Sequence, residues 1–162
     1  MTEALYAKLM DYALRALGRR MMTEFEIHKK LVVKLRKITD NADDNVGEDV
    51  VKRVMNRLVE LELVNDDQYV RDFIRTKLIL NPSGKRGLQS KLRLKGIDYD
   101  FFEKIWDELQ TDDQDVLERA CNSFVRKKGS IDSRKQKERL MRYLASRGFE
   151  PHAIYKQLSK YS

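Results

Sequence analysis

Hydrophobic residues recur along this chain at intervals of three and four, which is the spacing of one face of an α-helix. The pattern predicts nine helices, at about residues 2–17, 23–38, 48–62, 66–80, 84–95, 98–109, 112–129, 133–147 and from 151 onward. No run of four or more residues alternates cleanly between apolar and polar, so no strand is predicted. Two prolines and seven glycines in 162 residues also favour long helices. We therefore expect an all-α fold.

One arrangement of leucines and a glycine occurs twice. Leu88 and Leu92 share a helix face, Gly96 follows as a helix stop, and Phe102 and Trp106 lie ten and fourteen residues after Leu92. The same intervals recur near the C-terminus, in Leu140, Leu144, Gly148, Ile154 and Leu158. Trp106 corresponds to Leu158, so we interpret it as a core residue. The agreement of both intervals indicates an internal repeat.

A looser third copy lies near the N-terminus. Leu31 and Leu35 have the same four-residue spacing, but the glycine is missing and a polar insertion occupies residues 39–47. We predict three tandem three-helix repeats, at residues 1–62, 63–110 and 111–162. The alternative is three amphipathic hairpins that resemble each other by chance.

Short polar motifs set the predicted helix starts. Thr23 and Glu26 form a capping box, and the Asn65-Asp66-Asp67 segment is expected to cap the fourth helix. Asp98 is the expected cap of the sixth helix, and Pro151 occupies a first-turn position of the ninth.

Three aspartates in the polar segment from Thr39 to Val46 could suggest a metal site. The segment contains Asp40, Asp43 and Asp44, but it lacks the glycine and the closing glutamate of a calcium loop. We interpret it as a solvated loop and predict no metal.

Composition indicates the cellular compartment of the protein and the charge of its expected partner. The single cysteine, Cys121, excludes an intramolecular disulfide and fits a reducing compartment. Neither a secretory signal nor an eighteen-residue apolar run is present, so we expect a soluble cytoplasmic protein with no membrane partner. The net charge is +7, and residues 111–162 carry 12 basic against 7 acidic side chains. This excess favours an anionic partner without identifying it.

Two stretches are strongly basic and supply our candidate residues for binding a filament or DNA. The first has seven basic side chains and no acidic one: Arg75, Lys77, Lys85, Arg86, Lys91, Arg93 and Lys95. The second lies between residues 126 and 147, and its candidates are Arg126, Lys127, Lys128, Arg134, Lys135, Arg139 and Arg142.

The second stretch has a predicted orientation. Lys135, Arg139 and Arg142 fall within about 60° of one another on a helix, away from Leu140 and Leu144. The hydrophobic face can pack while the basic stripe faces solvent and contacts phosphates. Ordinary solvated charge, with some residues chosen to suit helix C-termini, is the alternative.

No motif indicates catalysis. The chain has no phosphate-binding loop, no H-E-x-x-H, no zinc ligand set and no G-x-S-x-G, and its two histidines, His28 and His152, lie in different predicted repeats. We therefore predict a protein that is not an enzyme and needs no cofactor. An interaction scaffold with no nucleic-acid role remains a further alternative.

Ordered motifs over nearly the whole chain resemble the RecX regulators of the bacterial recombinase RecA. The first-repeat motif is Tyr12-Ala13-Leu14-Arg15-Ala16-Leu17, followed by Arg20, Thr23, Glu26 and Leu31. A second set of residues resembles the family's junction to its second repeat: Leu58, Leu61, Leu63-Val64-Asn65-Asp66, Tyr69 and Phe73. A third set resembles the core of the family's second repeat: Gly84, Gly87, Leu88, Leu92 and Lys95-Gly96-Ile97. The chain departs from the family at Ile38-Thr39, where a basic-glycine pair is common, and in the acidic insertion that follows.

The resemblance implies three tandem three-helix units in an elongated, curved array. It also implies a non-enzymatic regulator that binds the groove of the RecA–DNA filament and limits filament extension, ATP hydrolysis and strand exchange. The expected partners are the RecA filament and, through direct contact, single- or double-stranded DNA, and we expect a monomer. A general helical DNA-binding protein, such as a helix-turn-helix transcription regulator, is the alternative.

Overall fold

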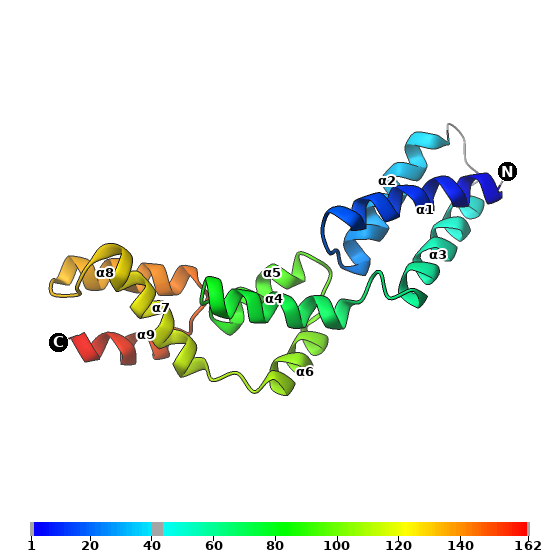
Figure 1. Cartoon of the computed structure of the whole chain (residues 1–162). Helices are drawn as coiled ribbons and strands as arrows, with labels where there is room; N and C mark the ends of the chain where they lie inside the picture. The colour runs from blue at the N-terminus through cyan, green and yellow to red at the C-terminus, as the bar shows by residue number, and fades with distance from the viewer. Residues whose placement is uncertain (1, 40–43, 162) are drawn as a thin grey trace. The chain divides into compact units, whose positions relative to one another are not determined.

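The computed structural model describes residues 2–39 and 44–161, and within these ranges every regular element is a helix. The helices are α1 (Thr2–Arg19), α2 (Glu24–Ile38), α3 (Asp44–Glu60), α4 (Asp66–Leu80), α5 (Lys85–Arg93), α6 (Tyr99–Leu109), α7 (Asp113–Lys128), α8 (Arg134–Ser146) and α9 (Pro151–Leu158), followed by the short 3-10 helix η1 (Ser159–Tyr161). Figure 1 shows them in chain order. The predicted all-α fold with nine α-helices is confirmed for the described residues.

Polar side chains begin most helices where the sequence predicts. The Thr23 hydroxyl accepts the Glu26 N–H at 3.3 Å, and the Glu26 carboxylate accepts the Thr23 N–H at 3.1 Å, which completes the capping box. Asp98 accepts the N–H of Phe101 at 2.8 Å. Each cap satisfies a backbone donor that the first helical turn leaves unpaired.

The start of α3 was predicted wrongly. The helix begins at Asp44 rather than at Glu48, and the remaining aspartates of the predicted loop, Asp40 and Asp43, lie outside the described residues. Gly47 is buried inside the helix, and a Cβ atom there would lie 2.8 Å from a Leu35 methyl group. Gly47 therefore does not end the helix. Its missing side chain lets α3 pack closely against Leu35 of α2.

Asp66 also differs from its predicted role. Asn65 caps α4 by accepting the Gln68 N–H at 3.1 Å. The Asp66 carboxylate instead accepts the N–H of Glu24, in the first turn of α2, at 2.8 Å. This residue therefore links two helices that are distant in sequence.

The chain divides into two compact units, and the first comprises residues 1–69 with 95–97. Its helices α1, α2 and α3 pack together, as Figure 1 shows in blue and cyan. Leu9, Ile27, Leu31, Val54 and Leu58 are fully buried between them. The three amphipathic faces thus share one hydrophobic core.

The segment 95–97 is fixed to the start of α2 in this first unit. The Thr23 hydroxyl donates a hydrogen bond to the Lys95 carbonyl oxygen at 2.6 Å, and the Lys95 ammonium group pairs with Glu26 at 3.0 Å. Gly96 has φ +83°, and a Cβ atom there would lie 2.2 Å from the Phe25 Cβ. Only glycine suits both this backbone conformation and this contact.

The second unit comprises residues 70–94 with 98–162. Val70, Ile74, Leu88, Leu92 and Ile105 are fully buried in its first part. The rings of Phe102 and Trp106 stack with centroids 5.7 Å apart, and both are buried, so the prediction that Trp106 is a core residue is confirmed.

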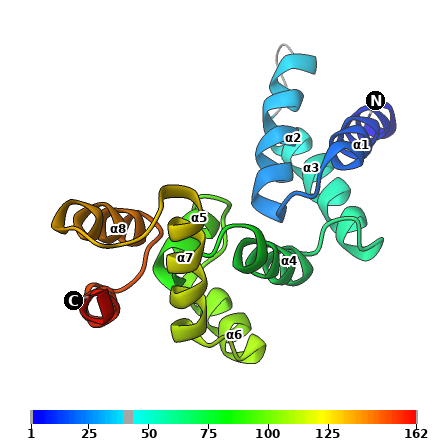
Figure 2. The same cartoon turned by 60° about the vertical axis from the view of Figure 1, so that its left-hand side comes forward.

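A further hydrophobic cluster of the second unit joins α7, α8 and α9. Its buried members include Leu117, Phe124, Leu140, Leu144 and Ile154. Figure 2 shows α8 and the C-terminal helix near each other in a second view. The leucine spacing that indicated a repeat therefore marks the residues of this core.

Candidate functional site

The first turn of α5 packs directly on the turn that follows α8. The Gly84 N–H donates to the Arg147 carbonyl oxygen at 2.8 Å. A Cβ atom at Gly87 would lie 2.4 Å from the same oxygen, so only glycine permits this approach. Gly148 has φ +81°, which turns the chain away after the contact. The backbone of Arg147 is thus held against α5.

Three cations from three helices gather near this contact. Lys91 lies one helical turn beyond Gly87 on α5, Lys77 belongs to the last turn of α4, and Arg147 follows α8. Burial, followed by repulsion from Lys77 and Arg147, lowers the pKa of the Lys91 ammonium group. We call Lys77, Lys91 and Arg147 the cationic cluster.

Aromatic rings support two members of the cationic cluster. The Lys77 Nζ atom lies 5.6 Å from the centroid of the Phe73 ring, and the Arg147 guanidinium lies 5.0 Å from the centroid of Tyr143. Tyr143 itself packs on Phe124, with centroids 5.2 Å apart. These contacts stabilise the positive groups without neutralising them.

Nothing in the described part of the chain neutralises the cationic cluster. None of the ion pairs found among residues 2–39 and 44–161 includes Lys77, Lys91 or Arg147. Like charges held together cost free energy, and such an arrangement is typical of functional sites. The chemistry that would offset the repulsion is an anion with several oxygen acceptors, such as a phosphodiester.

Four of the fourteen predicted binding residues are engaged in ion pairs. Lys85 pairs with Glu103 at 2.8 Å, Arg86 with Glu150 at 2.9 Å, Lys95 with Glu26 at 3.0 Å, and Arg134 with Glu138 at 3.3 Å. The hydrogen bond that the Lys85 ammonium group donates to the Glu103 carboxylate raises the pKa of Lys85 above its usual value. These cations are therefore less available for an external anion than their sequence context suggested.

The stripe on α8 is exposed, as its periodicity predicts. Lys135, Arg139 and Arg142 face solvent, whereas Leu140 and Leu144 are fully buried. Like the cationic cluster, the stripe belongs to the second unit. It adds positive charge that a phosphate chain could contact.

The remaining predicted residues are exposed on other helices. Arg75 lies on α4, Arg93 on α5, and Arg126, Lys127 and Lys128 form the last turn of α7. Those at the end of α7 also suit the negative end of the helix dipole.

Arg147 was not among the predicted binding residues. The signal that could have identified it is the pairing of a basic residue with a glycine, because Arg147-Gly148 corresponds to Lys95-Gly96 in the repeat. Both basic residues have their carbonyl oxygen bonded to the start of another helix. Only the folded chain brings Arg147 to Lys77 and Lys91.

Other classes of site find no support in the described residues. Cys121 is buried, and burial raises the pKa of its thiol, which disfavours the reactive thiolate. Across residues 2–39 and 44–161 no three His, Cys, Asp or Glu side chains come together as metal ligands. Over the same residues, each helix is too short or too polar to cross a lipid bilayer.

Comparison with known proteins gives consistent matches. Residues 111–158 match a family model described as RecX, third three-helix domain. The chain is 32% identical over 156 residues to a regulatory protein RecX of Chlorobium phaeobacteroides (strain BS1), covering 94% of this chain and 93% of that protein. It is 30% identical over 143 residues to a regulatory protein RecX of Mycobacterium sp. (strain JLS), covering 85% of this chain and 73% of that one.

Solved structures share the fold. The crystal structure of RecX from Lactobacillus salivarius matches with a TM-score of 0.74 at 22% sequence identity, over 98% of this chain and 97% of that chain. A second crystal structure of a regulatory protein RecX matches with a TM-score of 0.70 over 98% of this chain and 73% of that chain.

Proposed function

The chain belongs to the RecX family of regulatory proteins, and we propose that it limits the growth, ATP hydrolysis and strand exchange of the RecA–DNA filament. Regulation of RecA without enzymatic activity is what membership of this family implies. Our proposal adds that this regulation is inhibitory and that the chain binds in the groove of the filament.

We propose that DNA phosphates in the filament contact the second unit directly. The observation that carries this proposal is the cationic cluster, in which Lys77, Lys91 and Arg147 meet without a neutralising carboxylate among the described residues. The α8 stripe of Lys135, Arg139 and Arg142 supplies further exposed positive charge. Backbone phosphates would provide affinity without sequence preference, as a regulator that follows a filament requires.

We further propose that the chain consists of three repeats, at residues 1–62, 63–110 and 111–162. Equivalent contacts support this division. The Thr23 hydroxyl bonds to the carbonyl oxygen before Gly96, and the Gly84 N–H bonds to the one before Gly148. In both cases the start of the second helix of one repeat, α2 or α5, contacts the glycine turn after the second helix of the next repeat, α5 or α8.

The test is a titration of RecA ATP hydrolysis on single-stranded DNA with the purified chain. We expect hydrolysis to fall at substoichiometric amounts, because blocking filament extension affects many RecA subunits. The substitution Lys91→Glu should weaken inhibition while preserving the fold, because it replaces repulsion from Lys77 and Arg147 by attraction. Lys104→Glu changes the net charge equally on the exposed face of α6 and is the matched control. Unchanged hydrolysis throughout the wild-type titration would contradict the proposed function.

A further inference from the structure

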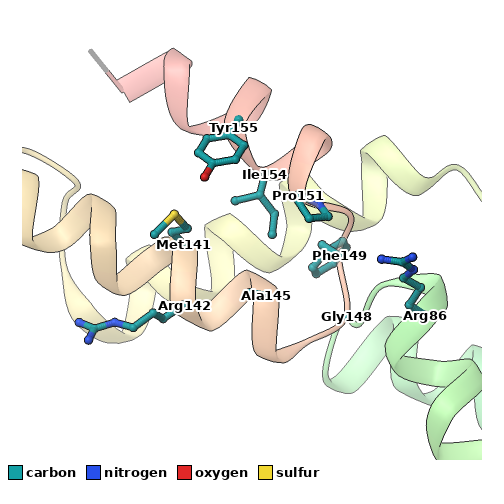
Figure 3. Close-up of a pocket in the computed structure, with 9 residues that line it drawn as sticks. All are labelled: Arg86, Met141, Arg142, Ala145, Gly148, Phe149, Pro151, Ile154 and Tyr155. Carbon is teal, nitrogen blue, oxygen red and sulfur yellow. The ribbon is translucent and has the colours of Figure 1, made fainter.

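A groove runs between α8 and α9 in the second unit. Its volume is about 420 Å³, and Arg86 lines it together with eight residues between Met141 and Tyr155. Figure 3 shows α9 along one wall and α8 along the other. The volume lies near the lower end of the range for small-ligand pockets, about 300–1,000 Å³, and suits one or two bulky side chains.

The groove is predominantly apolar. Met141 and Ala145 contribute from α8, Ile154 and Tyr155 from α9, and Phe149 lies between the helices. Tyr155 is 65% exposed, although most of its surface is an aromatic ring. An exposed apolar recess beside charged residues is typical of a protein-binding site.

An arginine lies toward each end of the groove. Figure 3 places Arg86 beside Phe149 at one end and Arg142 beyond Met141 at the other. Arg86 pairs with Glu150 at 2.9 Å, but the two side chains are 66% and 58% exposed, so a ligand can displace this pair at small cost. Arg142 is exposed, and no carboxylate of the described ranges pairs with it.

We propose that this groove binds a segment of a partner protein in which one bulky apolar side chain is flanked by acidic residues. The apolar side chain enters between Met141 and Tyr155 and covers Ile154. Carboxylates on either side reach Arg86 and Arg142, which fixes the direction and position of the segment. This inference goes beyond the proposed function, because it requires neither RecA nor DNA.

The lining favours a peptide over a nucleobase. A base needs hydrogen-bond partners along its edge when it leaves water, and the walls here are aliphatic or aromatic apart from the Tyr155 hydroxyl and the two arginines. An aliphatic or phenyl side chain loses no hydrogen bonds on entering. The chemistry of the groove therefore differs from that of the cationic cluster, whose three named members are all basic.

The binding experiment uses fluorescence anisotropy with a labelled peptide that carries one leucine between two runs of glutamate. We expect saturable binding to the full chain. Replacing the leucine with serine should weaken affinity about tenfold, since burial of a leucine side chain stabilises the complex by that order. Replacing the glutamates with lysines should abolish binding.

Substitutions in the chain locate the peptide. Ala145→Glu places a carboxylate in the exposed wall of the groove and should lower affinity about tenfold. Tyr155→Ala removes an exposed wall residue and should weaken the leucine peptide while leaving the serine peptide unchanged. Arg142→Glu should weaken both peptides, whereas Arg139→Glu, one turn earlier on α8 and outside the groove, is the control with equal charge.

Three results would overturn the inference. Equal affinity for the leucine and serine peptides would show that the groove does not recognise an apolar side chain. Equal losses in Arg142→Glu and Arg139→Glu, with none in Ala145→Glu, would reduce the interaction to general attraction by α8. Displacement of the peptide by oligodeoxythymidylate, with DNA affinity lost in Ala145→Glu and Tyr155→Ala, would assign the groove to nucleic acid.

Discussion

The N–H of Gly84 donates a hydrogen bond to the carbonyl oxygen of Arg147 at 2.8 Å. This bond joins the start of α5 to the turn between α8 and α9, and it fixes the backbone of a residue that helps to form the cationic cluster. The Thr23 hydroxyl makes the corresponding bond to the Lys95 carbonyl oxygen at 2.6 Å in the first unit. Two contacts of the same design therefore attach a glycine turn to the start of another helix.

Gly87→Ala should destabilise the second unit. The added Cβ atom would lie 2.4 Å from the Arg147 carbonyl oxygen and 2.9 Å from the Arg147 carbonyl carbon. Both are backbone atoms that cannot move independently of the chain. We expect the free energy of unfolding to fall by about 1–3 kcal/mol, the usual cost of overpacking. Urea denaturation followed by circular dichroism measures this change.

Gly18→Ala is the matched control for that substitution. Gly18 lies in α1 with no atom within 4 Å of its hypothetical Cβ. Alanine there should stabilise the protein by about 0.4–1 kcal/mol, because it reduces the entropy of the unfolded chain. Equal effects of the two substitutions would show that the Gly87 contact is not needed.

Thr23→Val should weaken the first unit. Thr23 is fully buried, and valine removes the hydroxyl that bonds to both Lys95 and Glu26. We expect a loss of about 1–3 kcal/mol in the free energy of unfolding, since the Lys95 carbonyl loses a buried partner. Thr23→Ser keeps the hydroxyl and should recover most of that loss; an equally large loss with serine would point to packing by the methyl group instead.

The stability contributed by the Glu24–Asp66 contact should depend on pH. Burial raises the pKa of both carboxyl groups, and repulsion from Asp66 further raises the pKa of Glu24. A carboxyl group whose pKa is higher in the folded state binds its proton more tightly there. The unfavourable contribution is therefore present at neutral pH and disappears as the pH falls through the folded-state pKa values.

Asp66→Asn tests this pH dependence. The asparagine carbonyl oxygen can still accept the Glu24 N–H, while the negative charge is removed. The variant should be more stable than the wild type at about pH 7, and the difference should shrink toward about pH 4. Urea unfolding at several pH values measures it, and a difference that grows on acidification would contradict the assignment.

Lys91→Gln should lower the affinity for single-stranded DNA without changing sequence preference. Removing one phosphate contact should also reduce the slope of log affinity against log salt concentration by about 0.7. Anisotropy titrations at several salt concentrations measure both quantities. Lys104→Gln is the control, and an identical slope for the wild type and Lys91→Gln would remove Lys91 from the DNA interface.

Helix positions and much of the core followed from sequence because they depend on local spacing. Leu140 and Leu144 share a face through the helical repeat, and Thr23 with Glu26 forms its capping box within four residues. The start of α3 could not be predicted from the sequence, because glycine is typical of turns whereas Gly47 lies inside the helix and packs against Leu35. Here a tertiary contact overrode local propensity.

The candidate site was less predictable, because charge along a sequence does not reveal its partners. Lys85 and Glu103 are 18 residues apart, and Lys95 and Glu26 are 69 apart, yet each pair forms an ion pair. The cationic cluster likewise combines residues from α4, α5 and the end of α8. Its members could be assigned only after the glycine contact had placed Arg147 against α5.

Cosedimentation with RecA filaments tests the central claim most directly, because regulation of the filament requires binding to it. The purified chain is mixed with RecA assembled on single-stranded DNA, and with RecA or DNA alone, before centrifugation. We predict that the chain pellets with the assembled filament and that Lys91→Glu leaves more of it in the supernatant than Lys104→Glu does. A wild-type chain that stays in the supernatant to the same extent with and without filaments would contradict the account.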